Sequence, residues 1–234
     1  MQAMTRPTDH AAPLIGQNDE LPANAKRVYL VRHVQAHSWG VPCAMDPDLN
    51  AFGEAQLEAV REHCAQLTVD VIITSELLRA QRTARALQRA AHCELLIDPE
   101  WNEFHAVGRW RDHSLEETQR QALGRVYRPD QRAGGGESLR ELHRRSRSAW
   151  ERLLQLPARN VLLVGHNAVL GTLLSWLFGL PESADRAAMI AYPHGAVSEL
   201  WSLDTSAEPD LPDRVTMLRY LCYAEHLKPH LLSY

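Results

Sequence analysis

The residues from Val28 to Val31 form a short apolar run, and the pair Arg32 and His33 follows it directly. The β-branched and aromatic side chains of this run predict a β-strand that is buried on both faces. Such strands belong to parallel sheets covered by helices, and they end at the edge where open α/β folds bind ligands. Taken alone, the pair more often marks only the polar end of a strand. The rest of the chain decides between the two interpretations.

The composition is that of an ordinary globular protein with one domain. The chain has 234 residues and a formal net charge of −4, so it has no basic field that would attract nucleic acid. Its cysteines lie far apart without a CxxC motif, which argues against a zinc site and a disulfide framework. Reduced thiols are expected in the cytoplasm, which is the predicted location. The cysteines are Cys43, Cys64, Cys93 and Cys222.

Two segments bear on targeting. Residues 1–26 contain no apolar run that resembles a secretory signal, and we expect them to be a mobile N-terminal tail before a single domain at 27–234. The segment 161–180 is uncharged over twenty residues. Its Gly165-His166-Asn167 interruption is costly in hydrocarbon, so a strand, a polar turn and an apolar helix are the better interpretation. No membrane partner is therefore expected.

Strand and helix patterns alternate along the chain. Further strands are expected at 69–74, 94–97, 196–203 and 214–222, with a strand-turn-helix unit at 160–180. Helices are expected at 51–67, capped by Asn50, and at 76–91, 114–126 and 138–156. This order predicts an α/β fold, a three-layer α/β/α sandwich with a mostly parallel central sheet. A helical insertion at about 105–136 would lie over the edge of the sheet that carries the active site.

Polar side chains with related chemistry recur at the predicted strand ends. Arg32 and His33 close the first strand, and Arg79 lies about one turn into the helix after the second. Glu103 follows the third strand, and His166 closes the fourth. Because the ends of parallel strands converge on one edge, these side chains are expected to line one pocket.

The residue types in this pocket point to a phosphorylated ligand. Arginine forks and helix N-termini match the geometry and charge of a phosphate group. A positively charged site also keeps a histidine neutral near pH 7. A neutral imidazole can attack phosphorus, while a carboxyl group protonates the leaving oxygen and then activates water.

Several motifs in order make the assignment more specific. They are LVRH at 30–33, DLNxxGxxQ at 48–56, TSxxxRAxxTA at 74–84, WxE at 101–103, GGES at 135–138 and VGHN at 164–167. Together they resemble the histidine phosphatase superfamily, which has the phosphoglycerate mutase-like fold. The resemblance extends from residue 27 to about residue 227.

The resemblance implies a role for each matching residue. His33 would accept the phosphoryl group, His166 would be the second catalytic histidine, and Glu103 would be the proton donor. Arg32 and Arg79 would clamp the phosphate. No metal and no cofactor are implied, since guanidinium and imidazole groups supply the positive charge. Further contacts to the substrate are expected from Asn167, Gln35, Trp39 and His194.

The sequence departs from the family pattern after His33. Val34 stands in place of the usual glycine, which matters if a positive φ is needed there. The T-x-x-N stretch of the mutases is replaced by residues 36–39, AHSW. These departures leave the chemistry intact, and the altered loop together with the short insertion favours a phosphomonoesterase over a mutase. The insertion also favours a small phosphorylated metabolite as the substrate. A phosphoglycerate mutase-type phosphotransferase and a non-catalytic binding module with the same fold remain alternatives.

Other conspicuous residues have simpler interpretations. Glu137 in GGES is expected to help cap the following helix or to anchor its loop. His33 and His37 have the spacing of a metal pair, but that spacing requires a helix and this region is expected to be a loop. The sequence leaves the oligomeric state open, and a homodimer is one of the states it allows. Surface charge is expected for Arg82, Arg85, Arg89, Arg144, Arg145, Arg147 and Arg152.

Overall fold

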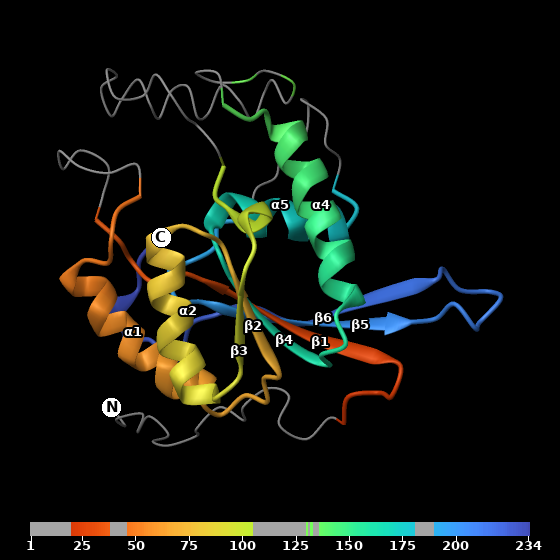
Figure 1. Ribbon diagram of the computed structural model, residues 1–234, viewed down its shortest axis with the longest axis horizontal. Coiled ribbons are helices and arrows are strands. Elements are labelled where there is room, and N and C mark those ends of the chain that lie inside the picture. The colour runs from red at the N-terminus through yellow and green to blue at the C-terminus, as the bar shows by residue number, and fades with distance from the viewer. Residues whose placement is uncertain (1–19, 38–45, 105–129, 131, 133–135, 181–189) are drawn as a thin grey trace, which may run out of the picture.

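The computed structural model describes residues 20–37, 46–104, 130, 132, 136–180 and 190–234, and it shows a central sheet between two layers of helices (Figure 1). The described strands are β1 (Ala25–Arg32), β2 (Val71–Thr74), β3 (Glu94–Ile97), β4 (Asn160–Gly165), β5 (Val197–Asp204) and β6 (Arg214–Tyr223). The described helices are α1 (Ala51–Cys64), α2 (Leu78–Ala91), α4 (Leu139–Gln155) and α5 (Asn167–Leu177), with short 3₁₀ helices η1 (Pro99–Trp101) and η3 (Pro229–Leu231).

The described strands form one sheet in the order β3-β2-β4-β1-β5-β6. β1 pairs in parallel with β4, β4 with β2, and β2 with β3. β5 is antiparallel to β1, and β6 is antiparallel to β5. The predicted α/β fold with a mostly parallel sheet is therefore confirmed.

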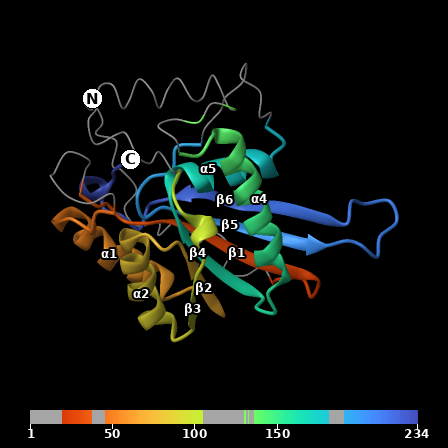
Figure 2. The ribbon, with the colours of Figure 1, turned by 45° about the horizontal axis from the view of Figure 1, so that its top comes forward.

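Successive residues of β1 belong to two separate hydrophobic cores. Val28 and Leu30 are buried with residues of α4 and α5, whereas Tyr29 and Val31 are buried with residues of α1 and α2. This alternation follows from the period of two along a strand. α4 and α5 cover one face of the sheet and α1 and α2 cover the other, as Figures 1 and 2 show. The three layers agree with the prediction.

Side-chain caps fix where helices α1 and α4 begin, and Asn50 is the cap that was predicted for α1. The side chain of Asn50 accepts a hydrogen bond from the Gly53 amide at 2.8 Å, at the start of α1. Ser138 and Glu141 form a reciprocal capping box at the start of α4. Glu137 forms an ion pair with Arg145, which agrees with the anchoring role that was predicted as the alternative to capping. The prediction of surface charge is wrong for Arg145, since this ion pair is largely buried.

Several element boundaries differ from the prediction. The helix predicted at 51–67 ends at Cys64. Beyond it, the amides of Gln66 and Leu67 bond to carbonyls three residues back. α2 begins at Leu78 rather than at 76. Ala25 and Lys26 belong to β1 instead of the tail, because antiparallel pairing with β5 extends the strand. Tertiary partners set these limits, and a local pattern does not reveal them.

Some predictions fall on residues outside the described ranges. These include most of the tail at 1–26, the helix at 114–126 and nearly all of the insertion at 105–136. Trp39 and Cys43 also lie outside the described part of the chain.

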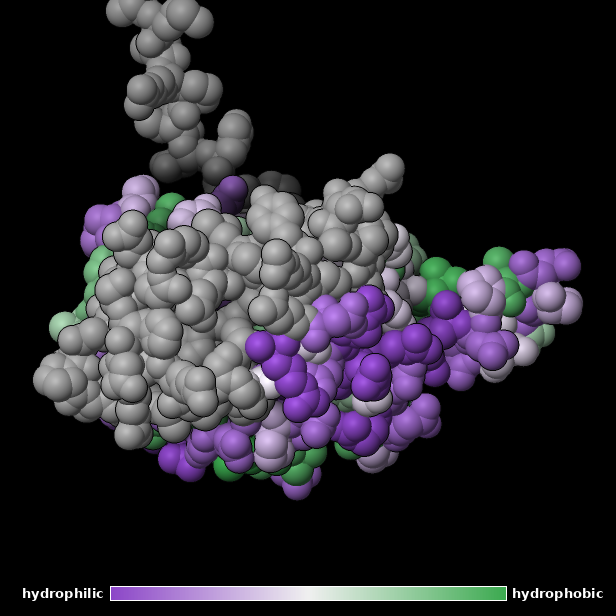
Figure 3. Space-filling model, turned by 90° about the horizontal axis from the view of Figure 1, so that it is seen from above, coloured by the Kyte–Doolittle hydropathy of each residue, from purple (hydrophilic) through white to green (hydrophobic). Residues whose placement is uncertain are grey.

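The segment at 161–180 folds as β4 followed by α5, as its polar interruption predicts. Among the described helices, none has the length and apolar character needed to cross a membrane. Seen from above, the described surface is largely hydrophilic and its hydrophobic areas are scattered (Figure 3).

Gly53 offers a test of the packing between α1 and the loop after β1. A Cβ atom at this position would lie 1.9 Å from the carbonyl oxygen of Gln35. Glycine to alanine ordinarily stabilises a helix by about 0.5–1 kcal/mol. We expect Gly53→Ala instead to lower the free energy of unfolding by more than about 2 kcal/mol, because backbone must move to relieve the clash. Urea unfolding measures the change, and equal or higher stability would contradict the close approach.

Candidate active site

The parallel strand ends bring the predicted residues together at one edge of the sheet. Arg32 at the end of β1 pairs in register with Gly165 at the end of β4. The amide of His33 donates to the Gly165 carbonyl at 3.0 Å, which continues this pairing. The ring centres of His33 and His166 lie 4.9 Å apart as a result. One phosphoryl group can therefore contact both imidazoles.

The hydrogen bonds of His33 indicate one tautomer of its buried ring. Nδ1 lies 2.7 Å from the carbonyl oxygen of Val34, which can only accept, so Nδ1 carries the proton. Arg79 donates from Nε to His33 Nε2 at 3.3 Å. Both contacts leave the lone pair on Nε2. That nitrogen is therefore the nucleophilic atom of the ring.

Val34 requires no unusual backbone conformation. In the described part of the chain, positive φ values outside glycine occur at His92 and Cys222 and not at Val34. The Val34 side chain is fully buried in the core beneath α1 and α2. Its amide donates to Thr83 Oγ1 at 3.3 Å. Replacement of the glycine that is usual in the family thus leaves His33 in place without backbone strain.

Arg79 lies in the first turn of α2, and its side chain is held beside His33. Its Nη1 atom is 3.5 Å from Asp46 Oδ1. Both carboxylate oxygens of Asp46 also accept from the Leu78 amide at 2.8 Å, at the start of the helix. Asp46 was not predicted as part of the site. It fixes the start of α2 and orients the guanidinium.

Arg32 is held by backbone and by a third imidazole. Its Nη1 atom donates to the Tyr192 carbonyl, and its Nη2 atom is 2.8 Å from His194 Nε2. Because a guanidinium only donates, His194 accepts on Nε2 and carries its proton on Nδ1, 3.1 Å from Ser233 Oγ. The Nε atom of Arg32 is buried and has no acceptor among the described residues. A bound anion would supply that acceptor.

Glu103 and His166 meet at the N-terminus of α5. The two carboxylate oxygens of Glu103 accept from the Ala168 amide at 3.1 and 3.2 Å. These bonds fix the orientation of the Glu103 carboxyl group at the start of α5. His166 is the N-cap residue of the same helix, and its Nε2 atom is 2.7 Å from Ser75 Oγ. The predicted proton donor and second histidine thus share one rigid support.

The electrostatics of the site favour neutral imidazoles and cationic arginines. Burial lowers the pKa of His33 well below its ordinary value, and His166, Arg79 and Arg32 lower it further. Burial and then Arg32 lower the pKa of His194 to about 3. Burial lowers the pKa of Arg32 to about 10, so this side chain stays protonated near neutral pH. The site is therefore suited to bind an anion next to a neutral nucleophile.

The predicted substrate contacts take varied positions. His194 lies in the site, with its ring centre 5.3 Å from that of His33. Gln35 accepts from Asn50 Nδ2 at 2.9 Å, and Asn167 accepts from the Tyr192 amide at 2.8 Å. Gln35 and Asn167 thus hold neighbouring loops in this structure, and their contact with substrate stays a prediction. Trp39 lies outside the described ranges.

Local sequence patterns do not indicate which residues support the site. Tyr192 acts through its backbone carbonyl, which carries no residue preference, and Ser233 is 39 residues away from its partner His194. Ser75 was visible only as part of the TSxxxRA motif. Within the described ranges, no group of three or more His, Cys, Asp and Glu side chains is arranged to hold a metal ion.

Comparison with known proteins agrees with this geometry. The sequence profile described as "Histidine phosphatase superfamily (branch 1)" matches residues 28–204, from β1 to the end of β5. This match covers most of the chain. The chain therefore belongs to the histidine phosphatase superfamily.

Relatives in this family carry both mutase and phosphatase names. "Probable phosphoglycerate mutase GpmB" of Serratia proteamaculans (strain 568) is 35% identical over 170 residues, which cover 68% of this chain and 78% of that protein. The structure of alpha-ribazole phosphatase from Shigella flexneri is 25% identical with a TM-score of 0.65, covering 84% of this chain and 96% of that one. The mycobacterial glucosyl-3-phosphoglycerate phosphatase in complex with VO3 has a TM-score of 0.68 at 22% identity, covering 85% and 100%.

The buried histidines predict that the free energy of unfolding decreases as the pH falls. The pKa of His194 is about 3 in the folded protein, against about 6.5 in an unfolded chain. As pH falls below about 6.5, the unfolded chain binds a proton that the folded protein excludes, so the free energy of unfolding decreases. This contribution of His194 is fully present only above that pH. We expect His194→Gln to reduce the loss between about pH 7 and pH 5 by on the order of 1–2 kcal/mol.

Urea unfolding at several pH values measures this effect. His230→Gln is the matched control, because His230 is exposed and its replacement should leave the pH dependence unchanged. An unaltered pH slope in the His194 variant would show that this ring is not kept neutral by the fold.

Proposed function

We propose that this protein is a phosphomonoester hydrolase that works through a phosphohistidine on His33. The observation that carries the proposal is the environment of His33 Nε2. This unprotonated nitrogen lies beside Arg79, with the ring of His166 4.9 Å away. A nucleophile surrounded by fixed cationic donors is what in-line attack on a phosphate ester requires.

In the first step, His33 Nε2 attacks phosphorus and the bond to the ester oxygen breaks. Arg32 and Arg79 neutralise the charge on the non-bridging oxygens, since their forks match a phosphoryl group. Glu103 in its acid form gives its proton to the departing oxygen. The first products are a free alcohol and a phosphoryl group bound to His33.

In the second step, the Glu103 carboxylate takes a proton from a water molecule, and the oxygen of that water attacks phosphorus. The phosphorus–nitrogen bond breaks, inorganic phosphate is released and His33 Nε2 regains its lone pair. Glu103 is thereby protonated for the next turnover. No external reductant, oxidant or metal is needed to balance either step.

A phosphoglycerate mutase-type reaction is the second candidate, because curated relatives carry that name. Such an enzyme forms the same phosphohistidine but returns the phosphoryl group to a second hydroxyl. Two observations support the hydrolase instead: the replaced T-x-x-N stretch and the similarity to the alpha-ribazole phosphatase from Shigella flexneri. A non-catalytic binding module is the third candidate function. It is disfavoured because all five catalytic positions are filled by reactive residues.

The substrate class is a small phosphorylated metabolite. Arg79, His33 and His194 are buried and Arg32 is partly buried, which suits a ligand whose phosphate enters the protein. The cytoplasm remains the proposed location, and it rests on the cysteine pattern, with Cys64, Cys93 and Cys222 free in the described part of the chain.

His33→Ala tests the nucleophile. We expect kcat/KM for p-nitrophenyl phosphate to fall by several orders of magnitude, because the variant cannot form the covalent intermediate. Phosphate release gives the rate, and acid-quenched protein incubated with radiolabelled substrate reports the phosphohistidine. His230→Ala should behave like the parent protein.

The same assay separates the candidates. Rapid release of phosphate supports the hydrolase, whereas a committed mutase releases very little. A binding module shows neither turnover nor label. Full activity in the His33→Ala variant would show that the proposed mechanism is wrong.

Glu103→Gln tests the proton donor. We expect a loss of about 10²- to 10⁴-fold in kcat for phenyl phosphate, whose leaving group needs a proton, and a much smaller loss for p-nitrophenyl phosphate. The slope of log kcat against the pKa of the leaving phenol measures the difference. Equal losses across the series would contradict the acid role.

A further inference from the structure

Arg145 forms a buried ion pair on the face of α4 that packs against the rest of the protein. Its Nε and Nη2 atoms lie 2.7 and 2.9 Å from the two carboxylate oxygens of Glu137, which belongs to the GGES motif. Only 13% and 11% of the two side chains are exposed. In contrast, the pair of Arg147 and Glu151 on the same helix is more than half exposed. The environment of Arg145 therefore differs from that of an ordinary surface arginine.

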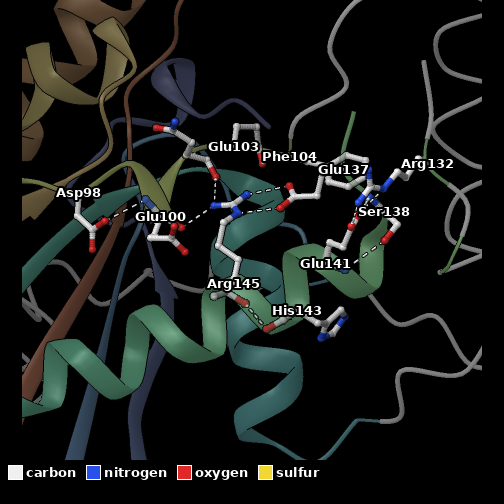
Figure 4. Close-up of polar contacts among 12 residues, drawn as sticks. Asp98, Glu100, Glu103, Phe104, Arg132, Glu137, Ser138, Glu141, His143 and Arg145 are labelled. Carbon is white, nitrogen blue, oxygen red and sulfur yellow. Dashed lines mark hydrogen bonds and ion pairs between the residues drawn. The ribbon is translucent and has the colours of Figure 1, made fainter. Parts of the chain in front are cut away.

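The remaining nitrogen of Arg145 holds the chain just before the proton donor. Nη1 donates to the carbonyl oxygens of Glu100 and Asn102, the latter at 3.0 Å. Figure 4 shows the guanidinium between the Glu137 carboxylate and this backbone, close to Glu103. The carbonyls at the end of η1 carry partial negative charge, so a cation suits them. Glu137 in turn prevents the guanidinium from turning away.

The two residues that precede Glu103 are both anchored in the protein. Trp101 is fully buried in the core below α4 and α5. The Asn102 side chain accepts from the Glu76 amide at 3.1 Å and donates to the Glu76 carboxylate at 2.7 Å. Arg145 binds the backbone on both sides of Trp101, at the carbonyls of Glu100 and Asn102, and the second carbonyl belongs to the peptide bond that leads into Glu103. The Ala168 amide at the start of α5 binds the carboxyl group of Glu103 directly, whereas Arg145 positions the backbone that carries it.

We propose that Arg145 is a positioning residue for Glu103, held in its working orientation by Glu137. This inference rests on the proposed function, in which Glu103 protonates the leaving oxygen. The pair contributes geometry, since a buried ion pair adds little net stability after its desolvation cost. A shift of about 1 Å in a catalytic group can cost on the order of 10²-fold in rate.

The test compares Arg145→Lys with the parent protein on aryl phosphates of graded leaving-group pKa. Lysine keeps the charge but cannot bind Glu137 through two nitrogens and the two carbonyls through a third. We expect kcat for phenyl phosphate to fall about 10- to 100-fold and kcat for p-nitrophenyl phosphate to fall less than about 3-fold. KM should change little, because Arg32 and Arg79 are untouched.

Two further variants distinguish positioning from a structural role. Glu137→Gln should show the same dependence on the leaving group to a smaller degree, since it keeps the shape of the turn. The double variant of Arg145→Lys and Glu103→Gln should lose no more than Glu103→Gln alone, because both changes act on one proton transfer. Arg147→Lys is the matched control on α4 and should leave the whole series unchanged. Thermal unfolding of each variant verifies that it is folded.

The outcomes separate this inference from the proposed function. In one outcome, the loss of kcat in Glu103→Gln depends on the leaving group, but the folded variants Arg145→Lys and Glu137→Gln lose activity equally on all substrates. The positioning role is then wrong and the acid role stands. Additive losses in the double variant also overturn it. If Glu103→Gln itself shows no dependence on the leaving group, the acid role fails and the inference falls with it.

Discussion

The parallel pairing of β1 with β4 is the constraint on which the site depends. Both strands are buried on their two faces and end on the same edge, with Arg32 opposite Gly165. Because this register continues through the His33 amide, the two imidazoles are held side by side by backbone hydrogen bonds. A slip of one residue would turn the side chains of β1 to the opposite faces and separate them.

Burial gives the same residues their chemistry. A protonated imidazole next to two guanidiniums would be costly away from water, so His33 stays neutral and keeps its lone pair on Nε2. The arginines remain charged because carbonyls, Asp46 and imidazole nitrogens bind them. The arrangement thus combines a neutral nucleophile with cationic groups before any ligand enters, which lowers the reorganisation needed during reaction.

Family membership and detailed function rest on different parts of the molecule. The family match runs from β1 to the end of β5 and thus includes the strand ends that meet at the site, whose positions are set by the sheet. The supports around them, such as Ser233 beside His194 and Glu137 beside Arg145, come from the C-terminal segment and from α4. Such supports decide how firmly the side chains of the site are held, whereas the strand ends decide which side chains meet there.

The sequence by itself determined the layers of the fold, the capping residue Asn50, and the five residues at or near the strand ends. It could do so because apolar periodicity, caps and strand ends are local, and a residue at a strand end keeps its meaning wherever the strand lies. Only the tertiary structure decided that Arg145 is buried, that Asp46 and Ser233 support the site, and that β1 starts at Ala25. These outcomes depend on contacts between segments far apart in the chain, which local patterns do not encode.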